Sequence, residues 1–145
     1  LTHLRLGNVY GNPKNRGFID LVIRSLLKHL VKPITLSNDG QTLRDYIFID
    51  DVINAILAIK NRTTHHGIIN LVSGTSYSLR DIVMLIETLI GNQLPITQPA
   101  APLVDELLAI RTSNSLLRNT FGFKIFTPLK SGLEQTLQRY QKELL

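Results

Sequence analysis

The 145-residue sequence contains no cysteine, which excludes disulfide scaffolds, zinc-thiolate sites, iron-sulfur clusters and cysteine nucleophiles. Its apolar runs, such as residues 55–59 and 82–86, are far shorter than the roughly 18 residues needed to cross a bilayer. No secretory signal peptide is visible. We therefore expect a cytoplasmic protein that does not associate with membranes. Met84 is the only methionine, so Leu1 is not expected to be a translation start and a longer chain is expected.

Two sequence motifs of redox enzymes are also missing. No Gly-x-Gly-x-x-Gly fingerprint opens a strand-to-helix turn, so these residues are expected to bind no NAD or NADP. Tyr10 and Lys14 have the spacing of a Tyr-x-x-x-Lys pair, but the turn residues Gly11-Asn12-Pro13 lie between them. His65-His66 has no carboxylate cluster nearby, so no metal site is expected. The sequence therefore predicts no catalytic, cofactor-binding or metal-binding residue.

The charge is moderately positive, with 16 Lys and Arg against 11 Asp and Glu and a net charge of +5. Such a surface attracts anions. The basic residues are scattered, without a run of five and without the interleaved aromatic residues of nucleic-acid modules. This pattern favours an ordinary solvated surface over nucleic-acid binding, and it leaves a small phosphorylated molecule as an allowed partner.

Short apolar segments alternate with amphipathic ones along the chain, which predicts an α/β fold with about five helices. Pro33 ends the first helix, and a Pro-rich segment over residues 93–102 is expected to be extended. Strands are expected at residues 4–9, 34–36, 46–49 and 68–72, and helices at 18–30, 50–60, 78–90, 113–121 and after Thr127-Pro128.

Several side chains are predicted to fix the helix ends. Ser78 and Asp81 have the spacing of a capping box. Asp50 or Asp51 is expected to cap the helix over residues 50–60, which is apolar on nearly all sides and is therefore expected to be mostly buried. Thr127-Pro128 has the residue types of an N-cap and first helical position.

Asn8 and Arg44 are the candidates for binding chemistry. Asn8 ends the first strand at a turn, where binding residues concentrate in α/β proteins, although a turn asparagine can simply bond its own backbone. Arg44 follows the turn at residues 38–40 and is expected in a loop. There its guanidinium can grip a phosphate through two hydrogen bonds, or pair with Asp45 or a surface carboxylate.

Four segments together resemble the C-terminal, substrate-binding part of NAD-dependent sugar-nucleotide epimerases and dehydratases, in the extended short-chain dehydrogenase/reductase family. They read LRLGNVYG at residues 4–11, RDYIFIDDV at 44–52, NLVSG at 70–74 and FGF at 121–123. The resemblance covers essentially the whole chain, so residues 1–145 are expected to form one substrate-binding lobe of a Rossmann-type parent. It implies that the N-terminal nucleotide domain, with its NAD or NADP and its catalytic residues, is absent.

The resemblance also implies roles for particular residues. Asn8 and Arg44 fall on positions that contact the diphosphate of a nucleotide sugar, and Gly17 and Phe18 on positions that touch the nucleotide. In the parent, hydride transfer to NAD gives a keto-sugar, and inversion or elimination is followed by return of the hydride to the sugar. These 145 residues alone are expected to be inactive.

The sequence departs from the family pattern at three places. Ser37-Asn38 stands where an aromatic residue and a glycine are usual, although asparagine tolerates a left-handed turn. Ala101-Pro102 replaces an Arg-Pro pair that adds a phosphate contact. Arg111 stands where an aspartate is expected before Ser113. We hypothesise that Arg111 replaces the positive charge of the missing Arg-Pro pair.

Two further expectations follow. A non-catalytic binding module with the same fold is the alternative to an enzyme part, and the presence of a glycine fingerprint and a Tyr-x-x-x-Lys motif upstream distinguishes the two. A first strand without its sheet leaves an apolar edge open, which predicts self-association or a homo-oligomer.

Overall fold

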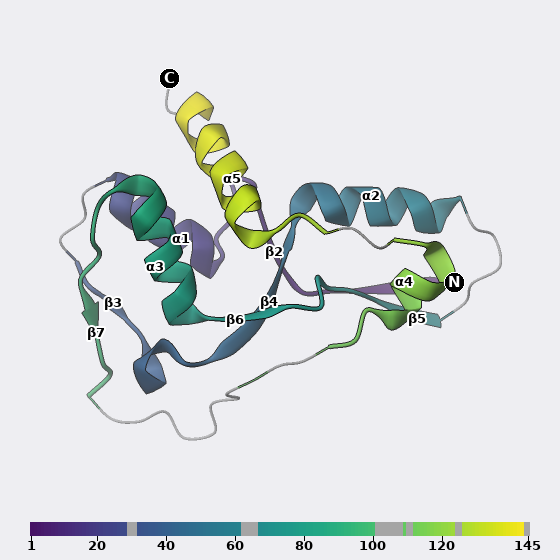
Figure 1. The fold of residues 1–145 in the computed structure, drawn as a ribbon, viewed down its shortest axis with the longest axis horizontal. Coiled ribbons are helices and arrows are strands. Elements are labelled where there is room, and N and C mark those ends of the chain that lie inside the picture. Colours follow the sequence, from purple (N-terminus) through teal and green to yellow (C-terminus); the bar gives the residue numbers. More distant parts are fainter. Residues whose placement is uncertain (29–31, 62–66, 101–108, 110–111, 124–125, 144–145) are drawn as a thin grey trace.

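The computed structural model describes residues 1–28, 32–61, 67–100, 109, 112–123 and 126–143. Within them, five α-helices alternate with short strands, which confirms the α/β class (Figure 1). No helix in these ranges is long and apolar enough to span a membrane. The elements are β1 (Thr2–Leu6), β2 (Asn8–Tyr10), α1 (Phe18–Leu27), β3 (Ile34–Thr35), the 3-10 turn η1 (Ser37–Gly40), β4 (Leu43–Phe48), α2 (Ile49–Lys60), β5 (Gly67–Leu71), β6 (Ser76–Ser78), α3 (Leu79–Ile90), β7 (Ile96–Thr97), α4 (Ser115–Phe121) and α5 (Leu129–Glu143).

The strands form three small sheets, and β4 is the central strand of the three-stranded one. β1 lies parallel to β5, β3 lies parallel to β7, and β4 lies between parallel β2 and antiparallel β6. Successive side chains of a strand point to opposite faces. Accordingly, Tyr46 and Phe48 enter one hydrophobic core, whereas Ile47 between them enters another. β4 therefore separates two cores.

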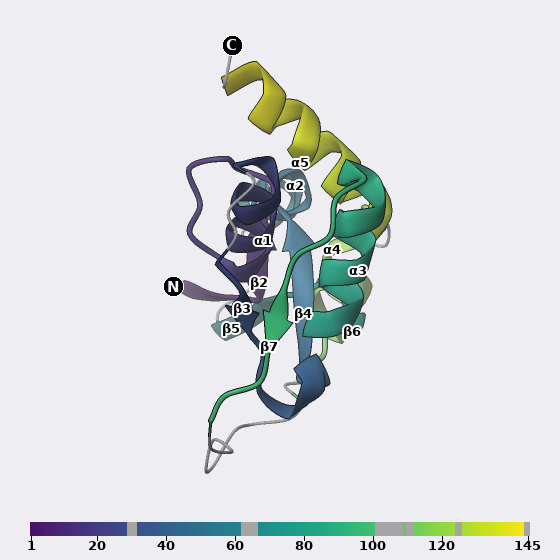
Figure 2. The ribbon, with the colours of Figure 1, turned by 90° about the vertical axis from the view of Figure 1, so that its left-hand side faces the viewer.

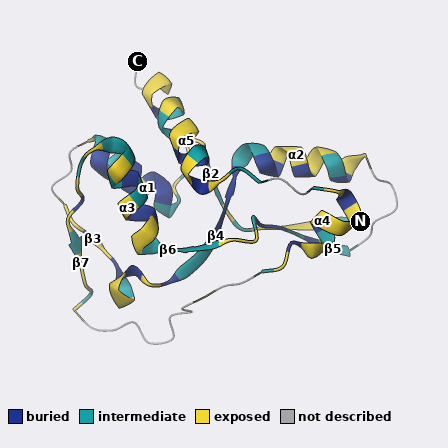
Figure 3. Cartoon of the chain, in the orientation of Figure 1, coloured by how far each residue is buried: buried dark blue, intermediate teal, exposed yellow. Residues whose placement is uncertain are grey.

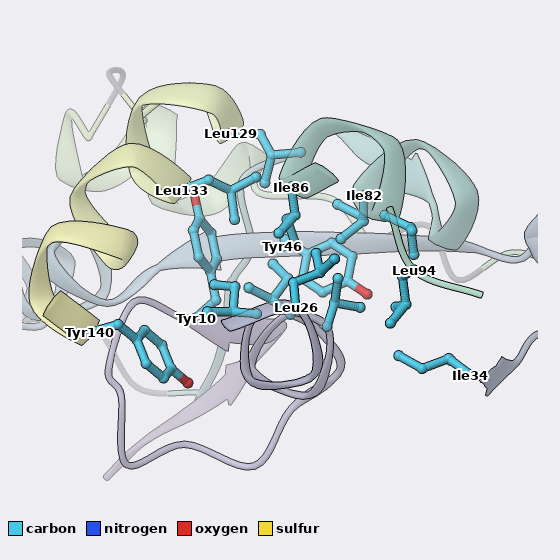
Figure 4. Packing of buried hydrophobic residues seen from close by; sticks show 14 of the residues in the cluster. Tyr10, Leu26, Ile34, Tyr46, Ile82, Ile86, Leu94, Leu129, Leu133 and Tyr140 are labelled. Atoms are coloured by element: carbon cyan, nitrogen blue, oxygen red, sulfur yellow. The ribbon is translucent and has the colours of Figure 1, made fainter. Parts of the chain in front are cut away.

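The larger core lies among α1, α3, α5, β2 and β4, with β3 and β7 beside α1 and α3 (Figures 1 and 2). We call this region the closed lobe. Its helix α1 has the predicted apolar stripe, and Ile19, Val22, Ile23 and Leu26 are buried. Figure 4 shows Tyr10 and Tyr46 from the strands meeting side chains from all three helices. The closed lobe is thus packed from several sides.

The smaller core lies among β5, α2 and α4, and we call this region, together with β1, the open lobe. Ile53, Ile56 and Leu57 on the outer side of α2 are 49%, 39% and 52% exposed. Figure 3 shows this exposed side of the helix and the exposed strand at the N-terminus. The prediction that α2 is mostly buried is therefore wrong, because only one side of the helix packs on the β5 and α4 core.

Local signals place most helix ends correctly. The Ser78 hydroxyl accepts from the Asp81 amide at 3.0 Å and the Asp81 carboxylate accepts from the Ser78 amide at 3.3 Å, which confirms the capping box. Gly91 and Gly122 end α3 and α4 in left-handed conformation, with φ of 81° and 70°. The last predicted turn of α1 extends into residues 29–31, outside the described residues.

Candidate functional site

Asn8 and Arg44 lie on neighbouring strands of the same sheet. Asn8 opposes Tyr46 in the parallel pairing of β2 with β4, and Arg44 stands two residues before Tyr46. Opposed residues, and residues two apart on a strand, share a face of the sheet. Asn8 is exposed, and its amide Nδ2 donates to the Asp45 carbonyl at 2.9 Å. The two predicted site residues therefore lie on one face, one strand and two residues apart.

Arg44 lies inside β4, opposite Tyr77 of β6, so its predicted position in a loop is wrong. The strand forms because β2 and β6 supply hydrogen-bonding partners from distant parts of the chain. The Arg44 guanidinium donates to the Leu43 carbonyl at 2.8 Å. Burial raises the pKa of the Tyr46 phenol to about 12, and the positive charge of Arg44 acts in the opposite direction. The guanidinium is therefore electrostatically coupled to Tyr46 on the same face.

Gly17 and Phe18 lie at the start of α1. Phe18 is half-buried against the same core that Tyr46 enters. Gly17 precedes the helix with an extended backbone, φ −77° and ψ 178°, that any residue can adopt. A Cβ atom there would lie 3.5 Å from Asn15 Nδ2, an ordinary van der Waals contact. Neither backbone conformation nor space therefore requires glycine at position 17.

Asp45 anchors the loop that follows β5, a role that the sequence analysis missed. Its carboxylate accepts from the Ser73 amide at 2.8 Å, the Ser73 hydroxyl at 3.0 Å and the Gly74 amide at 2.7 Å. Burial raises the pKa of Asp45, while these donors lower it. A pocket of about 340 Å³ adjoins Asp45 and the loop. The alternative of an Arg44–Asp45 ion pair is wrong, since Asp45 binds the loop from the opposite face of β4.

Asn114 and Gly74 complete this anchored loop. The Asn114 side chain donates to the Ser73 carbonyl at 2.9 Å and to the Val72 carbonyl at 3.2 Å. Gly74 has a φ of 85°, and a Cβ atom there would lie 2.8 Å from Asn114 Nδ2. Glycine is therefore required at position 74 by both conformation and space. Asn70–Gly74 was noted as a family segment, but its contact with Asn114 had no local signal.

Asp51 binds the segment before α5 instead of capping α2. Its carboxylate accepts from the Thr127 amide at 2.7 Å and from the Thr127 hydroxyl at 2.9 Å. The N-cap of α2 is Phe48, without a side-chain cap bond, so the predicted capping role of Asp50 or Asp51 is wrong. The Thr127 hydroxyl donates to Asp51, and α5 begins at Leu129.

Arg139 holds α5 against β2 and α2. Its guanidinium donates to Asp50 Oδ2 at 2.7 Å and to the Gly11 carbonyl at 2.9 Å, and lies 5.0 Å from the centroid of the Phe48 ring. The segment that follows β2, beginning at Gly11, is therefore fixed to the C-terminal helix.

The departures from the family pattern have different outcomes. In η1, Asn38 has a φ of 48°, so the expected tolerance of a left-handed turn is confirmed, and Asp39 shares this conformation with a φ of 53°. Ala101-Pro102, Arg111 and the His65-His66 pair lie outside the described residues, so the Arg111 hypothesis stays a prediction. The described residues contain no group of three potential metal ligands.

Comparison with known proteins supports the resemblance. Residues 1–71 match the model of the NAD dependent epimerase/dehydratase family. CDP-abequose synthase of Salmonella typhimurium is 26% identical over 144 residues, which cover 94% of this chain and 47% of that protein. The chain thus spans about half the length of this curated relative.

Solved structures extend the likeness to the whole fold. UDP-glucose 4-epimerase of Thermus thermophilus, solved with NAD, superposes with a TM-score of 0.78 at 27% identity over 97% of this chain and 46% of the other. UDP-glucose 4-epimerase of Thermotoga maritima, solved with UDP-glucose, gives a TM-score of 0.85 at 22% identity over 99% and 47%. Residues 1–71 are therefore similar in sequence to the NAD dependent epimerase/dehydratase family, and the whole chain has the fold of about half of a UDP-glucose 4-epimerase.

Proposed function

We propose that this chain is the substrate-binding part of an NAD- or NADP-dependent enzyme that epimerises, dehydrates or reduces a nucleotide sugar. Asn8 and Arg44 hold the diphosphate, and Gly17 and Phe18 contact the nucleotide. The cofactor and the catalytic groups belong to a nucleotide-binding domain outside these residues, so the chain by itself binds no NAD and is inactive. We place the enzyme in the cytoplasm and assign it no nucleic-acid or membrane partner.

The observation that supports this proposal is the shared face of Asn8 and Arg44. An amide and a guanidinium donate hydrogen bonds to phosphate oxygens, and the guanidinium can do so through two parallel bonds. Phe18 is partly buried against the core that Tyr46 enters, and its ring offers a surface on which an aromatic base can stack. The contribution of these residues to the reaction is positioning, because a fixed diphosphate directs the sugar toward the cofactor.

The open lobe fits the same proposal. Most of the exposed large hydrophobic residues of the described chain belong to it, and the chain covers 47% of CDP-abequose synthase. We propose that the remaining domain covers this surface in the parent, and that two copies of the isolated chain associate through it.

Calorimetric titration of this chain with UDP, CDP, dTDP and GDP tests the diphosphate site, since the relatives use these four nucleotides. For the nucleotide that binds, Arg44→Gln is expected to weaken affinity about 10- to 150-fold, because a hydrogen bond to a charged group contributes roughly 1.5–3 kcal/mol. Binding of the matching nucleoside is expected to change little. Arg118→Gln, an exposed arginine on α4, is the matched control.

Two outcomes would contradict the assignment. Equal weakening of nucleoside and nucleoside diphosphate by Arg44→Gln would place Arg44 away from the phosphates. No binding of any of the four diphosphates would remove the site from this chain. An upstream sequence without a glycine fingerprint and a Tyr-x-x-x-Lys motif would instead favour the non-catalytic binding module.

A further inference from the structure

A pocket of about 390 Å³ lies between α1, α5 and the segment that follows β2. This volume is within the range of roughly 300–1,000 Å³ that accommodates small-molecule ligands. None of its lining residues is among the proposed diphosphate contacts. They are Pro13, Lys14, Arg24, Leu27, Lys28, Tyr140 and Glu143.

The lining combines an apolar floor with an excess of positive charge. Leu27 and the Tyr140 ring provide apolar surface, whereas Lys14, Arg24 and Lys28 carry three positive charges against the single negative charge of Glu143. Lys14 and Lys28 are both exposed, so their ammonium groups stand at the mouth of the pocket. This arrangement complements a ligand that has an anionic head group and an apolar body.

Arg24 and Tyr140 are held in place before any ligand arrives. The Arg24 guanidinium donates to the Pro13 carbonyl and lies 5.5 Å from the centroid of the Tyr140 ring. The Tyr140 hydroxyl donates to buried Asp20 Oδ1 at 2.7 Å on the far side from solvent. Figure 4 shows Tyr140 on α5 at the margin of the closed-lobe core. Groups that are already ordered lose little conformational freedom when a ligand binds.

The Arg24 guanidinium retains binding capacity in this arrangement. An arginine side chain has five N–H donors in a planar fork that matches the oxygens of phosphate and carboxylate. Asp20, the nearest buried acid, is only 1% exposed and lies beneath Tyr140. Its carboxyl interacts electrostatically with Arg24 from the buried side, and Asp20 is not among the residues that line the pocket.

We propose that the pocket between α1 and α5 binds a small organic anion. A phosphate or carboxylate head group pairs with Arg24, Lys14 and Lys28, and a ring-sized apolar body lies on Leu27 and Tyr140. The site is independent of the diphosphate contacts at Asn8 and Arg44.

Titration of the ¹⁵N-labelled chain followed by NMR tests this site. We use phenyl phosphate and benzoate as probes, with inorganic phosphate and benzyl alcohol as the comparators that lack the apolar body or the charge. At least one probe is expected to shift the amide signals of Arg24, Lys28 and Tyr140 with a higher affinity than either comparator. The probe that binds with higher affinity shows whether the site prefers a phosphate or a carboxylate head group.

Charge variants sharpen the test because they act in opposite directions. Lys14→Gln and Lys28→Gln are each expected to weaken the probe about two- to fivefold, the usual size of one exposed charge interaction. Glu143→Gln is expected to tighten binding by a similar factor. Lys60→Gln on α2 and Glu134→Gln on α5 are matched controls, since both are exposed and neither lines the pocket.

Three results would overturn the proposal. One is no shift at the pocket residues with either probe. Another is equal affinity for benzyl alcohol, which would mean that charge plays no part. The third is an equal response of the pocket variants and their matched controls, which would mean that only net charge matters.

Discussion

The closed and open lobes on either side of β4 differ in how completely their apolar side chains are covered. Among the residues that the structure describes, the core of the closed lobe contains 16 buried hydrophobic residues and that of the open lobe 8. Of the nine large hydrophobic residues that are exposed in the described chain, seven belong to β1, α2, β5 or the residue before β1. The difference arises because three helices surround one core, whereas α2 and α4 cover only part of the other.

Helices α1 and α2 show the difference within similar sequences. Both are rich in isoleucine, leucine and valine. α1 buries its stripe between α3 and the strands, and α2 leaves Ile53, Ile56 and Leu57 in solvent. An apolar helix face is stabilised when another surface covers it, and the tertiary structure decides whether that surface comes from this chain.

The largest expected effect is the contrast between two leucines. Leu133→Ala in α5 removes a side chain that is 0% exposed, and is expected to lower the free energy of unfolding by about 2–5 kcal/mol through lost burial and a cavity. Leu57→Ala in α2 removes one that is 52% exposed and is expected to change it by less than about 0.5 kcal/mol. Urea unfolding measures both. Similar losses would show that the two lobes are covered equally.

A second test probes how tightly the closed lobe is packed. A Cβ atom at Gly132 would meet the Tyr10 hydroxyl oxygen and lie 2.8 Å from Tyr10 Cζ, so Gly132→Ala is expected to cost about 1–3 kcal/mol. The Tyr10 hydroxyl is buried without a partner in the described residues. Tyr10→Phe should therefore be tolerated and should recover part of the loss in the double variant. If the effects of Gly132→Ala and Tyr10→Phe simply add in the double variant, the strain does not come from the contact between these two residues.

The buried carboxyl of Asp20 makes the closed lobe pH-sensitive. Burial raises the pKa of Asp20 above 3.8, although the Tyr140 hydroxyl and Arg24 oppose the change. Between pH 3.8 and the raised pKa, the folded chain binds more protons than the unfolded chain, so this group lowers stability as the pH rises.

Asp20→Asn removes this dependence. Relative to the unmodified chain, the variant is expected to gain about 1.4 kcal/mol for each unit by which the pKa was raised, as the pH passes through that interval. Urea unfolding at a series of pH values measures the gap between the two proteins. If the stability of the variant relative to the unmodified chain falls as the pH rises, the pKa of Asp20 is not raised.

The smallest effect on folding stability is expected at the outer side of α2, where association should change instead. Ile53→Lys with Leu57→Lys should shift the chain toward monomer in analytical ultracentrifugation, because charges disfavour burial of this surface between copies. The matched control is Leu21→Lys with Met84→Lys, which places the same charges on exposed apolar positions of the closed lobe. An unmodified chain that stays monomeric at every concentration would contradict self-association.

Part of the fold follows from local patterns. The stripe over residues 18–27, the capping box at Ser78 and Asp81, and the glycines after α3 and α4 are correctly predicted because their partners lie within a few residues. The misplacement of Arg44 has a nonlocal cause, since β4 becomes a strand only through pairing with β2 and β6. Asp51 was misassigned for the same reason, because Thr127 lies 76 residues away.

The sequence by itself determined the α/β class, the family resemblance and the choice of Asn8, Gly17, Phe18 and Arg44, since these depend on residue type and order. Only the tertiary structure decided that Asn8 and Arg44 share a face, that Asp45 and Asp51 anchor distant segments, and that Arg24 and Tyr140 line a pocket. Side-chain chemistry is fixed at each position by the sequence. Which side chains meet depends on strand register and helix packing, which the whole chain settles cooperatively.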